Sequence, residues 1–213
     1  MADNFAEVQA YVDALVRYFV LRPPVDPGPL RALYDAKRYT ALVGHMRDSL
    51  SLDIRLRVGY VFSGGPQNAP LWVDVPISIP RYGTEAFRRT TVDMYIRKEF
   101  IERAPFGAVI EGIAHELSHI VLEGLDHPLK RYERAVDLTA MVLGYRHFTP
   151  GMEYGSRIVF SDLYSDPRKF FKGVWDELRG SRSQLGYLTR EEGEYALKLM
   201  ERMDAKNKRS ASR

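Results

Sequence analysis

In the first fifty residues, apolar side chains recur with the period of an α-helix. In residues 4–21 they recur every three or four positions, and Asp3 or Asn4 stands where a helix cap is expected. The proline-rich stretch 23–29 stops this helix, because proline lacks the backbone donor that a helix interior needs. A second helix is predicted from Leu30 to Ser49. Residues 1–50 are therefore interpreted as a helical segment packed on the rest of the chain.

Beyond residue 51 the period changes to that of β-strands. Segments 52–62 and 71–79 alternate apolar and polar positions and are separated by a glycine-rich turn. Residues 90–97 alternate again. Their apolar positions also fit a helix, but a strand to about Ile96 is the favoured interpretation. These segments predict a small mixed or antiparallel sheet.

The helical period returns between Pro105 and Gly124 with a broad apolar stripe. Pro105 suits the first turn of a helix and Gly124 suits its C-terminal cap. The stripe predicts that this helix is buried, and its members are Phe106, Val109, Ile110, Ile113, Leu117, Ile120 and Val121.

Helices are also predicted over 131–145, 170–178 and 186–205. The last of these has Thr189 at its cap and Glu192 three positions later, the spacing of a capping box. Together the segments predict an α+β fold that is mainly helical, with the small sheet packed on helix 105–124.

Composition narrows the chemistry that the chain can perform. Cysteine is absent, which excludes disulfides and thiolate metal ligands, so His, Asp and Glu are the only metal ligands available. The 213 residues are 45% hydrophobic, enough for one domain with a core. No signal peptide and no membrane span is recognised, so a cytoplasmic protein without membrane association is expected.

The charge balance gives little sign of a nucleic-acid partner. The net charge is +3, and much of it falls in the C-terminal residues, of which 206–213 are expected to form a disordered basic tail. A nucleic-acid-binding surface would interleave basic and aromatic residues on a folded face, and no such stripe is found. No nucleic-acid partner is therefore expected.

The candidate chemistry lies in the middle of helix 105–124, where the chain reads His115-Glu116-Leu117-Ser118-His119. Side chains four apart share a helix face, so both imidazoles can point at one Zn²⁺. Glu116 can then reach a water on the metal and act as its general base. The alternative is a pair of ordinary histidines, but burying them and a glutamate on so apolar a helix is costly without a partner.

A catalytic zinc needs a third protein ligand, and the next predicted helix offers one. Glu133 and Asp137 stand four apart and share a face. Glu133 can supply the carboxylate ligand, and Asp137 can accept the other ring N–H of His115. The alternative for Asp137 is a surface ion pair with Arg134 or Lys130.

Three residues between the two helices compete for the third ligand position. Glu123 lies four residues after His119, but the advance of the helix carries it past the metal. Asp126 and His127 can curl back from the connecting loop. The metzincin pattern fails, because Leu122 and Leu125 hold the positions where it needs glycine and histidine.

The two motifs together resemble those of the gluzincin metallopeptidases, the thermolysin clan, most closely its compact intracellular members. The likeness covers about residues 90–146. It implies that His115, His119 and Glu133 hold one zinc ion, that Glu116 is the base, and that Asp137 supports His115. It also implies that 51–205 form a zincin-like catalytic domain. In this clan an edge strand beside the active helix binds the peptide, so Val92 to Arg97 are the candidate docking edge, and an internal strand is the alternative.

The predicted function is that of a zinc-dependent metallopeptidase, in which a zinc-bound water activated by Glu116 attacks a peptide or protein substrate. A further donor should stabilise the oxyanion, and the candidates are Tyr145, His147, Tyr154 and Tyr187. The alternative is a zinc-binding regulatory or scaffold protein without general proteolytic activity. A third interpretation, a nucleic-acid binder, would depend on the basic tail.

Overall fold

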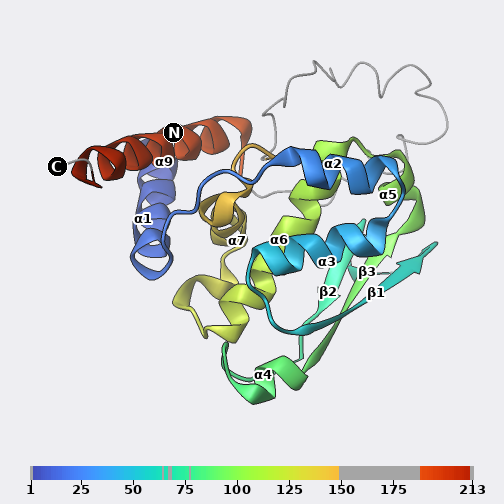
Figure 1. Cartoon of the computed structure of the whole chain (residues 1–213). Helices are drawn as coiled ribbons and strands as arrows, with labels where there is room; N and C mark the ends of the chain where they lie inside the picture. Colours follow the sequence, from blue (N-terminus) through green and yellow to red (C-terminus); the bar gives the residue numbers. More distant parts are fainter. Residues whose placement is uncertain (1, 64, 67–68, 77, 149–187, 212–213) are drawn as a thin grey trace.

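The computed structural model describes residues 2–63, 65–66, 69–76, 78–148 and 188–211 (Figure 1). It confirms a mainly helical α+β fold with a small mixed sheet. The helices before the sheet are α1 (Ala2–Tyr18), α2 (Pro27–Asp35) and α3 (Tyr39–Ser49). The strands and the helices between them are β1 (Arg55–Val61), β2 (Leu71–Asp74), α4 (Glu85–Arg89) and β3 (Thr91–Arg97). After β3 come α5 (Lys98–Arg103), α6 (Phe106–Gly124), the 3₁₀ helix η2 (Pro128–Arg131), α7 (Glu133–Ala140), the π-helical turn η3 (Met141–Tyr145) and α9 (Arg190–Ala211). The helix predicted over 170–178 lies outside the described residues.

Helix α6 lies between the sheet and α7, and it contacts β2, α3 and α7 (Figure 1). Its apolar stripe is buried as predicted except for the half-buried Phe106, with Val109, Ile113 and Leu117 fully enclosed. One core joins this helix to the sheet and to α3, and a second core lies between α1, α7 and α9. The motif of α6 is thereby held in the middle of the molecule.

The strand order is β1-β3-β2, with β1 parallel and β2 antiparallel to β3. The prediction that Val92 to Arg97 form a docking edge is therefore wrong, because β3 is the central strand. Its alternate side chains Val92, Met94 and Ile96 are fully buried, and both of its edges are paired. Strand order depends on non-local pairing, which the alternation in one segment does not encode.

The predicted helix from Leu30 to Ser49 is wrong in one respect, because it is two helices. Lys37 adopts φ 53° between α2 and α3. Its N–H bonds to the Tyr34 carbonyl, and the Arg38 N–H bonds to the Leu33 carbonyl. This is the Schellman arrangement, in which a left-handed residue ends a helix. Lysine stands where glycine is usual, so the sequence gives no sign of the break.

Helix α6 ends in the same way, and this corrects the expected cap. Gly124 is the last helical residue, and Asp126, with φ 49°, takes the left-handed position. Gly124 serves a different purpose, because a Cβ there would approach the Phe87 ring to 2.7 Å. The termination motif uses both Asp126 and His127, whose N–H groups bond to the Glu123 and Leu122 carbonyls.

The C-terminal helix α9 packs across α1 (Figure 1). Its predicted capping box is confirmed, since Thr189 N–H donates to Glu192 over 2.8 Å and Glu192 N–H donates to the Thr189 hydroxyl over 3.2 Å. The helix continues to Ala211, so residues 206–211 are helical and the expectation of disorder there is wrong. Lysine, arginine and alanine are good helix formers, and extending an existing helix is far easier than starting one.

None of the described helices has the length and apolar character needed to cross a membrane.

Candidate metal centre

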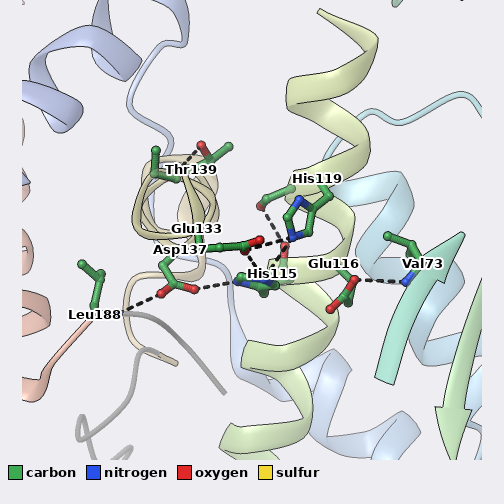
Figure 2. A network of polar contacts seen from close by, with 11 residues as sticks. Val73, His115, Glu116, His119, Glu133, Asp137, Thr139 and Leu188 are labelled. Atoms are coloured by element: carbon green, nitrogen blue, oxygen red, sulfur yellow. Dashed lines mark hydrogen bonds and ion pairs between the residues drawn. The ribbon is translucent and has the colours of Figure 1, made fainter. Parts of the chain in front are cut away.

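Two antiparallel helices bring the predicted ligands together. His115 and His119 leave consecutive turns of α6, and Glu133 and Asp137 leave consecutive turns of α7 (Figure 2). The loop between the helices folds α7 back so that Glu133 meets His119 and Asp137 meets His115. Because both motifs have a four-residue spacing, the two residues of α6 lie opposite the two residues of α7.

The three predicted ligand atoms form a nearly equilateral triangle. Nε2 of His115 lies 3.2 Å from Nε2 of His119, and Oε2 of Glu133 lies 3.4 Å and 3.3 Å from these two nitrogens. In a tetrahedral zinc site, with ligand atoms about 2.0–2.1 Å from the ion, neighbouring ligand atoms stand about 3.3 Å apart. The triangle therefore has the size of one face of a zinc tetrahedron, which leaves the fourth corner for another ligand.

The same three atoms are all acceptors, and such a close arrangement of acceptors is favourable only with a positive charge between them. Oε2 of Glu133 is buried and accepts no hydrogen bond from any described residue. Two imidazole nitrogens face each other, and their lone pairs repel unless a proton or a cation lies between them. A buried carboxylate oxygen without a donor is costly. One cation placed among the three atoms would satisfy all of them.

Asp137 fixes the orientation of His115. Its Oδ1 accepts the Nδ1–H of His115 over 2.7 Å, and its Oδ2 accepts the backbone N–H of Leu188 over 3.0 Å (Figure 2). With the proton on Nδ1, the lone pair of Nε2 is directed at the other ligand atoms. The side chain of Asp137 is only 4% exposed, so the alternative of a surface ion pair is wrong.

Glu116 extends from α6 on the side of the sheet. Its Oε2 accepts the backbone N–H of Val73 over 3.1 Å (Figure 2). Val73 belongs to β2, which lies at the edge of the sheet formed by the described residues, so the strand beside helix α6 is β2 and not β3. This contact holds the carboxylate of Glu116 between the histidines and the sheet edge.

The electrostatics of the site follow from burial and close opposite charges. Burial lowers the pKa of His115, but its hydrogen bond to Asp137 and the carboxylate of Glu133, 3.4 Å away, outweigh this and raise the pKa to about 10. Burial raises the pKa of Glu133, but the two imidazoles pull it down to about 2. The cluster thus favours a positive charge at its centre and an ionised Glu133.

Two further carboxyl groups near the cluster have raised pKa values. Burial raises the pKa of Glu116, although both histidines lower it in part, and a carboxyl with a raised pKa is a stronger general base. Burial, with the nearby charge of Asp137, raises the pKa of Glu111 well above its ordinary value.

The competing ligands all have other partners. Glu123 pairs with Lys130 over 2.9 Å, and the exposed Asp126 pairs with the same ammonium over 2.8 Å. His127 is buried, its Nδ1 accepts the N–H of Leu129 over 3.2 Å, and its ring packs against Tyr18. The structure brings none of the three into the cluster of His115, His119 and Glu133.

The structure describes only some of the residues that were predicted as oxyanion donors. Tyr145 is buried, and its hydroxyl shares a hydrogen bond of 2.6 Å with the Ser49 hydroxyl, so it is not a free donor. Burial raises the pKa of Tyr145 to about 12. Tyr154 and Tyr187 lie outside the described residues, and the described contacts among His115, His119 and Glu133 do not include His147.

Sequence reasoning missed three contributors to the site, namely Glu111, Val73 and Leu188. Glu111 lies four residues before His115, a spacing that marks it as belonging to the same helix face. Val73 and Leu188 act through backbone N–H groups, for which no side-chain pattern exists.

Comparisons of the chain with protein-family profiles, with curated proteins and with solved structures found no match. The functional interpretation therefore depends on the residues and their geometry.

Proposed function

We propose that this protein is a zinc-dependent metallopeptidase of the gluzincin type. The observation that supports it best is the triangle of Nε2 of His115, Nε2 of His119 and Oε2 of Glu133, with edges of 3.2, 3.3 and 3.4 Å. This triangle has the dimensions of a three-ligand zinc site with one open position. An open fourth position is typical of catalytic zinc, whereas structural zinc is closed by four protein ligands.

Each polar residue around the triangle then has a defined role. His115, His119 and Glu133 hold the ion, and Asp137 keeps the proton of His115 on Nδ1. When bound, zinc lowers the pKa of a water molecule and polarises the carbonyl that is attacked. Glu116 accepts a proton from the attacking water and passes it to the leaving amine. The side chains of His119 and Glu133 are 23% and 39% exposed, which gives solvent and substrate access to this side of the cluster.

The edge strand β2 offers a place for the peptide. Val73 lies opposite Met94 of β3, while its N–H is directed away from β3 and toward Glu116. The outer edge of β2 therefore runs beside the general base. An extended peptide can add to such an edge through main-chain hydrogen bonds, which would bring its backbone carbonyls close to the cluster.

The variant Glu116→Gln tests the proposal. Glutamine keeps the shape of the side chain and an acceptor for Val73, but it cannot take a proton. We expect peptide hydrolysis to fall about 10²- to 10⁴-fold, while zinc content and thermal unfolding stay as in the original protein. Hydrolysis is measured on a broad peptide library with and without chelator. Glu102→Gln, which removes an exposed carboxylate on α5, is the matched control and should leave hydrolysis unchanged.

A zinc-binding regulatory or scaffold protein is the second candidate function, because the same triangle would hold zinc without turnover. The absence of cleavage across the library, with zinc bound at one ion per chain, would favour it. Cleavage that survives in Glu116→Gln would remove Glu116 from the role of base.

A further inference from the structure

Asp137 of α7 joins the metal cluster to the start of α9. Its Oδ1 accepts the Nδ1–H of His115 over 2.7 Å, and its Oδ2 accepts the backbone N–H of Leu188 over 3.0 Å (Figure 2). The side chain of Asp137 is buried, so its charge is stabilised by donors of the protein rather than by water. The position of Leu188 therefore affects how firmly Asp137 holds His115.

A buried carboxylate fixes the place of Leu188. Glu192 closes the capping box with Thr189, the residue that follows Leu188, through its Oε2 atom. Its other oxygen, Oε1, pairs with the guanidinium of Arg134 on α7 over 3.3 Å. Taking a carboxylate out of water is costly unless donors and an opposite charge face it, and Glu192 has both. The start of α9 is thus held on α7 by an ion pair as well as by the bond from Leu188.

The contacts of α9 fall on the part of α7 that serves the metal cluster. Arg134 and Asp137 are three residues apart, which places them on the same side of the helix, and Asp137 also shares a side with Glu133. The Leu188 side chain belongs to the same core cluster as Val136. The first turn of α9 therefore packs against the segment that carries one proposed zinc ligand and the partner of another.

We propose that Glu192 is a positioning residue for the metal centre, and that docking of the first turn of α9 on α7 regulates the zinc affinity of the site. Its action passes through Leu188 to Asp137 and His115. With the turn docked, Asp137 is held by Leu188 and keeps its other oxygen on His115. With the turn released, Asp137 loses a donor and can rotate away from His115. The inference rests on the zinc site of the proposed function and does not depend on turnover.

Coupling of this kind acts in both directions. If docking of α9 strengthens zinc binding by some factor, bound zinc strengthens the docking by the same factor. Zinc should therefore slow hydrogen exchange of the Leu188 N–H, which exchanges when its bond to Asp137 opens. The effect should exceed that at amides near Asp204, which report the far end of the same helix.

The first measurement is zinc affinity, by competition with a chelating dye, in the wild-type protein and two variants. Glu192→Ala removes both the cap and the ion pair. Glu192→Gln keeps an acceptor for Thr189 but removes the charge that faces Arg134. We expect affinity to fall about three- to thirtyfold in Glu192→Ala and about two- to fivefold in Glu192→Gln, the range of coupling within one hydrogen-bond network.

Two control variants separate positioning from a general weakening of the fold. Glu194→Gln removes an exposed carboxylate of the same helix that pairs with Arg190. Asp204→Asn loosens the other end of α9, where Asp204 faces Arg146. Both should keep the zinc affinity of the wild-type protein, even if thermal unfolding shows Asp204→Asn to be as destabilised as Glu192→Gln.

The second measurement reports the ligand geometry directly. Cobalt replaces zinc, and the visible absorption bands of bound Co²⁺ depend on how its ligands are arranged. We expect these bands to shift in Glu192→Ala and to stay unchanged in Glu194→Gln and Asp204→Asn. Hydrogen exchange at Leu188, with and without zinc, is measured by NMR on the wild-type protein.

The outcomes separate this inference from the proposed function. Unchanged affinity and cobalt bands in the folded Glu192 variants, or an equal loss in Asp204→Asn, overturn the positioning role and leave the zinc site standing. Glu192→Gln decides alone if Glu192→Ala does not fold. A loss confined to the Glu192 variants, in a protein that cleaves no peptide, supports the inference and removes the peptidase. A wild-type protein that takes up no zinc overturns both.

Discussion

Two buried polar clusters in this protein differ in whether their charged and hydrogen-bonding groups find partners within the cluster. Beside α9, the guanidinium of Arg146 donates to Asp204 over 2.5 Å and to the carbonyl of Arg22 over 2.6 Å, and its side chain is 1% exposed. Between α6 and α7, His115, His119 and Glu133 bring together three atoms that all offer lone pairs.

This difference indicates the role of each cluster in the protein. In the first cluster a donor with a fixed positive charge faces acceptors, so the group is complete and ties α9 to the rest of the fold. In the second cluster acceptors face acceptors, and the geometry is completed by a proton on an imidazole or by a cation from outside. A polar cluster that is complete stabilises a fold, and one that lacks its central charge is suited to bind a ligand.

The largest effect should come from removing the third ligand. Glu133→Ala deletes the carboxylate oxygen that closes the triangle, and two histidines alone hold zinc weakly. We expect zinc affinity to fall by at least about 100-fold, measured by competition with a chelating dye. Glu123→Ala is the matched control, because Glu123 pairs with Lys130 outside the cluster and its loss should leave zinc affinity unchanged. Undiminished affinity in Glu133→Ala would return the ligand role to Asp126 or His127.

A smaller effect is expected from the residue that orients His115. Asparagine in Asp137→Asn has one acceptor oxygen where the carboxylate has two, so either His115 or Leu188 loses its partner. We expect zinc affinity to fall about 10- to 100-fold, the usual effect of changing the group that supports a metal-binding histidine. Calorimetric titration with zinc measures this. Unaltered affinity would reduce Asp137 to a purely structural contact.

The smallest effect on the metal should come from the other cluster. Asp204→Asn removes the charge that faces Arg146, and we expect the free energy of unfolding to fall by about 1–3 kcal/mol, since Asp204 is 29% exposed. Zinc affinity should stay the same, because the two clusters share no residue. Denaturant unfolding and zinc titration are measured on the same samples. A parallel loss of zinc affinity would show that the clusters are coupled and would break the comparison.

The features that the sequence predicts correctly are those governed by local spacing. Residues four apart on a helix share a face whatever surrounds them, so spacing alone pairs His115 with His119 and Glu133 with Asp137. The capping box at Thr189 and the buried stripe of α6 follow from local patterns in the same way.

The features that the sequence does not reveal depend on distant segments or on the backbone. The central position of β3 is decided by two partners far along the chain, and the contact of Glu116 with Val73 follows from which strand lies at the edge. The break at Lys37 is hidden because lysine rarely takes a left-handed conformation. The role of Leu188 lies in a backbone N–H that every residue except proline has.

The most direct test of the central claim is the metal content of the folded protein, measured by elemental analysis after purification without chelator and equilibration with zinc. We predict one zinc ion per chain in the original protein and in Glu116→Gln, and loss of that ion in His115→Ala. A folded wild-type protein that takes up no zinc would contradict the claim. A His115→Ala variant that holds as much zinc as the wild-type protein would also contradict it.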